Sequence, residues 1–283
     1  MNLHSIGVIG AGTMGNGIAQ VCALAGFNVT LLDITETALN KAIGTISKHL
    51  DRQIAKQALT EQNKLAALGR IHTSTDYSSL QKMQLVIEAA TENLDLKVRL
   101  LQQIDKQVNV DCVIASNTSS LSITQLAASV SHPERFIGLH FFNPVPVMGL
   151  IEVIRGLQTS DATHAQALEM ATVLGKTAIT AGNRPGFVVN RILVPMINEA
   201  ILVLQEGLAS TEDIDAGMQL GCNQPIGPLA LADLIGLDTV LAILEAFYEG
   251  FNDSKYRPAP LLKEMVAAGY LGRKTGRGFH AYA

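Results

Sequence analysis

Short apolar runs alternate with longer, helically spaced stretches along the first part of the chain. The runs predict five strands, at residues 5–10, 28–33, 85–89, 113–116 and 136–140. Apolar residues at three- and four-residue spacing predict helices between them, at residues 15–25, 35–56 and 94–107. Because crossover helices join parallel strands, this alternation predicts an α/β fold, with a Rossmann-like, doubly wound and mostly parallel sheet.

The pattern changes after residue 184. Helical spacing continues without a convincing strand, at residues 191–206, 211–220, 228–248 and 259–268. Ser210 is a good helix cap, and Asn183-Arg184-Pro185-Gly186 is a turn-forming, helix-breaking cluster. We therefore predict an NAD-binding Rossmann-like domain over 1–184 and an all-helical C-terminal domain over 185–283. The second domain is unusually apolar, which favours a homodimer formed through its surface, chiefly 191–206 and 228–248.

Composition narrows the class of protein. The net charge of −4 and the pI near 6.0 argue against broad binding to nucleic acid or to an anionic membrane surface. No uncharged apolar run approaches the roughly 18 residues of a membrane span, and the apolar run that starts by Ile6 leaves no room for a targeting segment. We therefore expect a cytoplasmic protein.

The cysteines are three in number and far apart, at Cys22, Cys112 and Cys222. None belongs to a CxxC or Cys/His pattern with metal-ligand spacing. We interpret all three as small buried residues in a reducing compartment, and we predict neither a disulfide framework nor a metal site.

A glycine turn follows the first predicted strand. It reads Gly10-Ala11-Gly12-Thr13-Met14-Gly15 and opens an alanine-rich helix. Gly10 permits the tight turn, Gly12 lets the backbone approach a pyrophosphate, and Gly15 lets helix and strand pack closely. A pyrophosphate would then meet the unpaired N–H groups of the helix N-terminus. The triplet is weak evidence alone, but the strand before it and the helix after it predict a dinucleotide site.

Asp33 ends the second predicted strand, 18 residues after Gly15. Its carboxylate can accept hydrogen bonds from ribose hydroxyls and repels a 2′-phosphate. Ile34 and Thr35 follow it, where an arginine would favour NADP. These residues predict NAD as the cofactor.

His140 ends the fifth predicted strand, and Glu152 lies twelve positions further on, in a candidate neighbouring strand. Open α/β sheets bind ligands at the carboxyl ends of their strands, so His140 is expected to face the cofactor. A carboxylate on one imidazole nitrogen would fix the tautomer while the other nitrogen takes a proton. A structural histidine is the alternative, and the sequence does not establish that the two side chains touch.

Several motifs, in order along almost the whole chain, resemble the L-3-hydroxyacyl-CoA dehydrogenases, and the short bacterial 3-hydroxybutyryl-CoA dehydrogenases are the nearest group. The motifs are the glycine turn, Glu88-Ala89-Ala90-Thr91-Glu92-Asn93, Ala115-Ser116-Asn117-Thr118-Ser119-Ser120-Leu121, His140-Phe141-Phe142-Asn143-Pro144, Pro185-Gly186-Phe187-Val188-Val189-Asn190-Arg191, Gly227-Pro228-Leu229, Asp233-Leu234-Ile235-Gly236-Leu237-Asp238 and Gly272-Arg273-Lys274-Thr275-Gly276-Arg277-Gly278-Phe279.

The resemblance implies NAD-dependent interconversion of (S)-3-hydroxyacyl-CoA and 3-oxoacyl-CoA. His140 would be the general base and, in reverse, the general acid, with Glu152 orienting it. Ser119 and Asn190 would hydrogen-bond the substrate oxygens near the reacting carbon. No metal or covalent intermediate is implied, since the cofactor carries the difficult step.

The resemblance also assigns residues outside the glycine turn to the cofactor: Glu92, Lys97, Asn117, Ser119, Asn143 and Lys274. Without it, each would be interpreted as structural. The lysines would be solvated charges, the 117–120 segment would be a polar turn capping the next helix, and Asn190 would be a helix N-cap.

Lys48, Arg52 and Lys56 recur at four-residue spacing, so they share a helix face that could meet CoA phosphates or could simply be solvated. The resemblance assigns Lys56 to CoA, and we add Arg52 and Ser119. His49 stands where the family has a hydroxyl residue, Gly149 where a lysine is usual, and Asn183-Arg184 where an acid is common. These departures bear on CoA binding rather than on hydride transfer.

Three alternatives stay open. A related 3-hydroxy (sugar) acid dehydrogenase would use no CoA, and a non-catalytic NAD-binding structural homologue would not need the His140/Glu152 pair. A 6-phosphogluconate-type dehydrogenase would be expected to use a catalytic lysine instead. The preferred acyl length and the metabolic pathway do not follow from the sequence.

Overall fold

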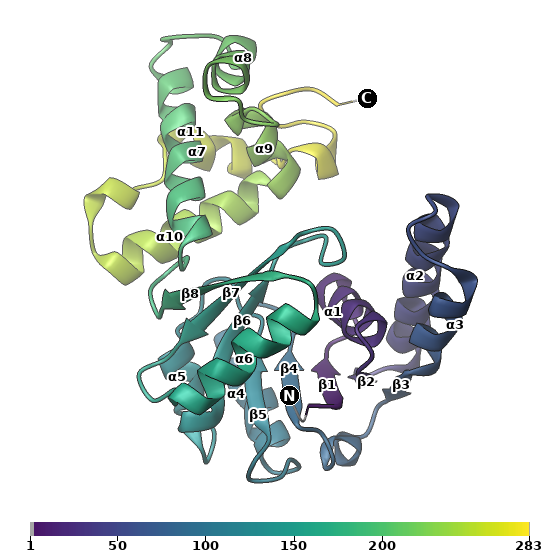
Figure 1. Ribbon diagram of the computed structural model, residues 1–283. Coiled ribbons are helices and arrows are strands. Elements are labelled where there is room, and N and C mark those ends of the chain that lie inside the picture. Colours follow the sequence, from purple (N-terminus) through teal and green to yellow (C-terminus); the bar gives the residue numbers. More distant parts are fainter. Residues whose placement is uncertain (1–2, 283) are drawn as a thin grey trace. The chain divides into compact units, whose positions relative to one another are not determined.

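The computed structural model describes residues 3–282, and the chain divides between Arg184 and Pro185 into two compact units (Figure 1). The first unit contains one eight-stranded sheet in the order β3-β2-β1-β4-β5-β6-β7-β8. Its strands are β1 (Ser5–Ile9), β2 (Asn28–Leu32), β3 (Ile71–Ser74), β4 (Leu85–Glu88), β5 (Val113–Ser116), β6 (Phe136–Phe141), β7 (Leu150–Arg155) and β8 (Thr177–Gly182).

Neighbouring strands are parallel except for β6 and β7, which are antiparallel. The prediction of a doubly wound, mostly parallel sheet is therefore confirmed. The chain order reverses between β1 and β4, and this switch point opens a crevice at the carboxyl ends of the strands.

Helices cover both faces of this sheet. They are α1 (Thr13–Leu24), α2 (Glu36–Ala55), α3 (Glu61–Gly69), α4 (Leu94–Asp105), α5 (Ile123–Ala127) and α6 (Asp161–Val173). Ile18 of α1 and Met170 of α6 share a core cluster with Ile6 and Val8. On the other face α5 packs so closely that a Cβ on Gly138 would meet Ile123 at 2.8 Å. Burial on both faces explains why the central strands are apolar along most of their length.

The short edge strands were not predicted. Only Ile71 is buried in β3, and β8 is largely exposed, so neither forms an apolar run. As a result His140 lies on the sixth strand rather than the fifth. Helix α6 was also missed, because its apolar residues spread around the helix instead of forming a stripe.

The second unit is helical, as predicted, with α7 (Val189–Gln205), α8 (Thr211–Cys222), α9 (Pro228–Ile235), α10 (Leu237–Phe251) and α11 (Pro260–Ala267). The expected single helix over 228–248 is wrong. Gly236 adopts φ +101°, a conformation that other residues rarely tolerate, and so divides the segment into α9 and α10. Ser210 caps α8 as expected, by accepting a hydrogen bond from the Asp213 N–H. Phe247 and Tyr256 are buried in the centre of this unit.

The expectation that every cysteine is buried is also wrong, because Cys222 is exposed at the end of α8. Cys22 and Cys112 are buried, and burial raises the pKa of each thiol to about 12. Within residues 3–282, no helix is both long enough and apolar enough to cross a membrane. The cytoplasmic location stays a prediction.

Candidate active site

The glycine turn lies between β1 and α1 at the carboxyl edge of the sheet. A Cβ on Gly15 would lie 1.7 Å from the carbonyl oxygen of Gly10, so no other residue fits where the helix crosses the turn. A Cβ on Gly12 would meet nothing within 4 Å, and Gly12 lines cavities on both sides of the turn. This backbone is open to a ligand, and the N-terminus of α1 beside it favours an anion.

Asp33 fixes this turn from the end of β2. Its Oδ2 accepts the Ala11 N–H and its Oδ1 accepts the Ile34 N–H, both at 2.7 Å. Carboxylate oxygens have further lone pairs, so Asp33 can still accept ribose hydroxyls. A cavity of about 340 Å³ begins here and is mainly apolar, lined by residues such as Tyr77 and Leu96. The turn, the acid and the apolar cavity fit a bound adenosine dinucleotide.

Sequence reasoning missed a buried carboxylate at the end of β4. Glu88 is 0% exposed and accepts hydrogen bonds from Lys97 Nζ at 2.8 and 2.9 Å, Ser116 Oγ at 2.6 Å and the Ala90 N–H at 2.7 Å. A charged residue ending an otherwise apolar strand was the available signal. Each of its oxygens is well satisfied, which is the condition under which a buried ion pair is tolerated.

Lys97, expected on the cofactor side, lies beneath the apolar cavity rather than in its lining. It is 1% exposed, and besides Glu88 its Nζ donates to the Ala90 carbonyl at 3.2 Å. Ala90 lines the cavity, so Lys97 holds part of the cavity wall. The interpretation of Lys97 as a solvated surface charge is wrong.

The polar segment predicted after β5 contains the site residues Asn117 and Ser119, and it is hydrogen-bonded to Glu92. Glu92 Oε1 accepts the Thr118 hydroxyl at 2.8 Å, the Ser119 hydroxyl at 2.9 Å and the Ser119 N–H at 2.5 Å. Glu92 Oε2 lies 3.5 Å from Lys97 Nζ. The Asn117 side-chain oxygen accepts the Phe141 N–H at 2.9 Å, next to His140. The structure therefore brings Glu92, Ser119 and Asn117 together at the carboxyl edge.

His140 and Glu152 are direct partners across the antiparallel pair β6–β7. The His140 Nδ1 lies 2.7 Å from Glu152 Oε2, and the two residues are 5% and 0% exposed. The ring of Phe142 lies beside the imidazole, with 4.5 Å between ring centroids. A buried carboxylate at this distance requires the proton on Nδ1, which makes Nε2 the nitrogen that can exchange a proton with a ligand.

The segment after His140 lines two further cavities. One of about 530 Å³ lies beside the glycine turn and includes Asn143 and Pro144. The other, of about 260 Å³, includes Pro146 together with Arg52 and Lys56 at the end of α2. His49, the departure noted on this helix, lines both cavities.

Two predicted site residues lie in the helical unit. Asn190 is the second residue of α7, and the N-cap position belongs to Val188, so the alternative interpretation of Asn190 as a helix N-cap is wrong. Lys274 follows Gly272 in a short 3₁₀ turn and forms an ion pair with Asp238, with Nζ–O distances of 2.5 and 2.6 Å. The pKa of Asp238 is lowered, because the hydrogen bonds from Lys274 and the backbone outweigh its partial burial.

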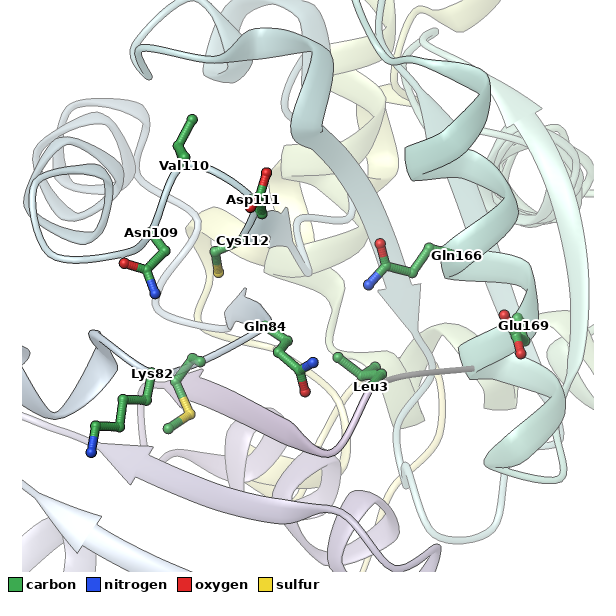
Figure 2. A pocket seen from close by; sticks show the side chains of 10 residues that line it. Leu3, Lys82, Gln84, Asn109, Val110, Asp111, Cys112, Gln166 and Glu169 are labelled. Carbon is green, nitrogen blue, oxygen red and sulfur yellow. The ribbon is translucent and has the colours of Figure 1, made fainter.

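A cavity of about 620 Å³ lies at the opposite, amino edge of the sheet, where residues precede β1, β4 and β5 (Figure 2). Its lining includes Lys82, Asp111, Gln84 and Gln166, and none of the predicted site residues. Among residues 3–282, no three or more His, Cys, Asp or Glu side chains are grouped so that they could hold a metal ion.

Comparison with known proteins gives the family of this chain. Residues 5–184 match the NAD binding domain of 3-hydroxyacyl-CoA dehydrogenase, and residues 186–282 match its C-terminal domain. A 3-hydroxybutyryl-CoA dehydrogenase of Bradyrhizobium diazoefficiens is 50% identical over 280 residues, which cover 99% of this chain and 96% of the relative. The 3-hydroxybutyryl-CoA dehydrogenase of Clostridioides difficile is 46% identical over 277 residues, covering 98% and 99%.

A solved structure agrees with these relatives. The crystal structure of (S)-3-hydroxybutyryl-CoA dehydrogenase from Ralstonia eutropha matches with a TM-score of 0.98 and 62% identity, and the match covers 100% of both chains. The resemblance seen in the sequence is thus confirmed. With both domain matches in order and an NAD-binding first unit, the chain belongs to the 3-hydroxyacyl-CoA dehydrogenase family.

Proposed function

We propose that this protein is an NAD-dependent dehydrogenase that interconverts (S)-3-hydroxyacyl-CoA and 3-oxoacyl-CoA, with 3-hydroxybutyryl-CoA as its short-chain substrate. The contact that carries the proposal is His140 Nδ1 to Glu152 Oε2 at 2.7 Å, at the same sheet edge as the glycine turn. The names of the relatives from Bradyrhizobium diazoefficiens and Ralstonia eutropha support the substrate.

His140 acts as the general base in the oxidative direction. Glu152 holds Nδ1–H, and Nε2 accepts the proton of the 3-hydroxyl group as the C3–O bond gains double-bond character. The imidazolium that forms is balanced by the buried Glu152 carboxylate. NAD, when bound, supplies the acceptor for the hydride that leaves C3. In reverse, His140 returns the proton to the 3-oxo oxygen.

Ser119 and Asn190 act as hydrogen-bond donors to the substrate oxygens. In the free protein the Ser119 hydroxyl donates its one proton to Glu92, so it has to exchange this partner for a substrate oxygen when acyl-CoA binds. Donors fixed before the reaction stabilise negative charge on the developing alkoxide, and loss of one such donor typically lowers kcat about 10²–10³-fold. The two residues belong to different compact units, so we also propose that the units close when acyl-CoA binds.

Arg52 and Lys56 bind the phosphates of CoA. Both line the 260 Å³ cavity at the end of α2, and both are exposed to solvent. Exposed cations close to a cavity suit a phosphorylated ligand that keeps part of its hydration. Lys48 shares their spacing but does not line this cavity, so Lys48→Ala is a matched control for Lys56→Ala.

The proposal is tested by following NADH consumption with acetoacetyl-CoA and with free acetoacetate. We expect turnover of the thioester, and a preference for NADH over NADPH. Turnover of free hydroxy or oxo acids without activity on the thioester would instead support the sugar-acid type of dehydrogenase. Binding of NADH without turnover of either substrate would support a non-catalytic homologue.

We further propose a homodimer formed through the helical unit. A mainly apolar cavity of about 460 Å³ lies between α7 and α8, lined by Met196, Val203 and Met218 among others. Leu220 nearby on α8 is largely exposed. Exposed apolar surface of this kind favours association with a second copy. Light scattering at micromolar concentration is expected to give twice the chain mass, and a monomer mass would contradict the proposal.

A further inference from the structure

The connection between β6 and β7, residues 142–149, determines the shape of two cavities. Pro144 and Pro146 line both the 530 Å³ cavity beside the glycine turn and the 260 Å³ cavity at the end of α2. His140 lies immediately before this connection, and Glu152 lies soon after it. A shift of the connection would therefore change both cavities next to the His140/Glu152 pair.

The connection has few backbone hydrogen bonds of its own. The N–H groups of Val147 and Met148 both donate to the carbonyl of Pro144, at 2.9 and 3.0 Å. Pro144 and Pro146 have no N–H group to donate. At its far end, the Gly149 carbonyl accepts the Thr177 N–H at 2.7 Å, where β8 begins beside β7.

The side chain of Lys176 adds hydrogen bonds to this connection. Its Nζ donates to the carbonyl of Val145 at 2.8 Å and to the carbonyl of Met148 at 2.6 Å. An ammonium group makes stronger hydrogen bonds than a neutral donor and can serve two carbonyls at once. Partial burial lowers the pKa of Lys176, in keeping with an ammonium group drawn away from water onto uncharged acceptors.

Helix α1 also supports the connection. Val145 is buried, and a Cβ on Gly17 would lie 2.9 Å from the Val145 Cβ. The connection therefore contacts both the ammonium group of Lys176 and the backbone of Gly17. Neither residue belongs to the predicted set of site residues.

We propose that Lys176 is a positioning residue for the dehydrogenase: its ammonium group fixes the 142–149 connection and with it the walls of the cavity that receives the thioester. The kinetic part of this inference rests on the proposed function. The structural part concerns the connection alone and can be measured without any substrate.

The first experiment measures amide hydrogen exchange of peptides that cover residues 142–149. Lys176→Met is expected to speed exchange at Val147 and Met148 by at least about tenfold, since the loss of both carbonyl contacts loosens the turn. Lys176→Arg keeps a cation with several donors and is expected to restore slow exchange. Lys106→Met, which removes an exposed lysine after α4, is the matched control. Unchanged exchange in a folded Lys176→Met protein would overturn the proposal.

The second experiment separates KM from kcat. Lys176→Met is expected to raise KM for acetoacetyl-CoA about tenfold and the Kd for NADH by less, because only Asn143 of the connection is assigned to the cofactor and the apolar cavity beside Asp33 does not involve the connection. Lys176→Arg should recover most of the KM. A rise in the Kd for NADH as large as the rise in KM for acetoacetyl-CoA would contradict a role in positioning this cavity. A lower kcat at constant KM would contradict it as well.

A second variant, at Gly17 of α1, distinguishes displacement of the connection from loss of folding. Gly17→Ala adds a methyl group against Val145 and leaves Lys176 in place, so it displaces the same connection without removing a charge. We expect the same rise in KM for the thioester and the same faster exchange. A wild-type protein inactive on acetoacetyl-CoA would refute the proposed function, whereas the exchange experiment would still decide on Lys176.

Discussion

The two edges of the sheet both carry cavities, but their polar groups are arranged differently. At the amino edge the cavity of about 620 Å³ is larger than any of the three at the carboxyl edge, which measure about 530, 340 and 260 Å³. Its charged residues Lys82, Asp111 and Glu169 are exposed to solvent (Figure 2). At the carboxyl edge Glu88, Lys97 and Glu152 are buried and ion-paired or hydrogen-bonded.

The direction of the helices explains part of this difference. Helices α1, α4 and α5 each begin just after a parallel strand ends, so their N-termini gather at the carboxyl edge. Helix N-termini carry partial positive charge and unpaired N–H groups, which favours anions such as a pyrophosphate. Cavity volume therefore does not identify the site in this fold. The site is identified instead by buried, paired charges beside helix N-termini.

The largest effect is expected for His140→Ala. Loss of the general base should lower kcat with acetoacetyl-CoA about 10³-fold, within the range typical of acid–base catalysis. The Kd for NADH should change less than about twofold, because His140 does not line the apolar cavity beside Asp33. Steady-state kinetics and fluorescence titration with NADH measure the two quantities. Activity within tenfold of wild type would assign His140 a structural role.

The next effect concerns stability. Glu88→Gln removes the nearer, buried counter-charge of Lys97 and leaves only the longer contact to Glu92 at 3.5 Å, which should lower the free energy of unfolding by about 3 kcal/mol. Calorimetry should then show Tm lower by about 6–12 °C. In the double variant Glu88→Leu/Lys97→Met both charges are gone, and part of the loss should be recovered. Full stability of Glu88→Gln would mean that the pair is not coupled as its geometry indicates.

A smaller effect is expected for Asp33→Ala. The Ala11 and Ile34 N–H groups lose their acceptor and the ribose loses its partner, so kcat/KM with NADH should fall about tenfold. With NADPH it should hardly change, since the repulsion of the 2′-phosphate disappears at the same time. Parallel assays with the two cofactors check this shift, and an equal fall with both would argue against a role in cofactor choice.

Local patterns were enough to predict much of the carboxyl edge. The glycine turn, Asp33 and His140 each follow an apolar run, so their place at the ends of strands could be read directly. The contact between His140 and Glu152 could not be read, because it depends on how the intervening connection folds and on the register of β6 against β7. Sequence spacing alone does not fix that register.

Other features could not be predicted from the sequence, and the reasons are again physical. Lys176 bonds to backbone carbonyls, which every residue possesses, so no pattern of residue types marks its role. The break at Gly236 stands inside an apolar run whose helical spacing continues across it. The edge strand β3 buries too little surface to show a period of its own. Burial and backbone conformation, rather than residue type, determine these features.

The smallest effect is expected at the amino edge of the sheet. It tests whether the cavity at this edge is separate from the proposed site at the carboxyl edge. Lys82→Ala and Asp111→Ala remove exposed charges from the lining of the 620 Å³ cavity. Surface substitutions of this kind usually change stability by less than about 0.5 kcal/mol. We expect kcat/KM within about twofold of wild type, and an unchanged Kd for NADH.

Lys97→Ala is the matched substitution at the carboxyl edge. It also removes a lysine side chain, but from a buried site. It should destabilise the protein strongly and weaken NADH binding, because Ala90 in the cavity wall loses its support. If Lys82→Ala instead lowered kcat/KM tenfold, the amino-edge cavity would be coupled to catalysis. The distinction between a solvated and a paired lysine would then no longer separate the two edges.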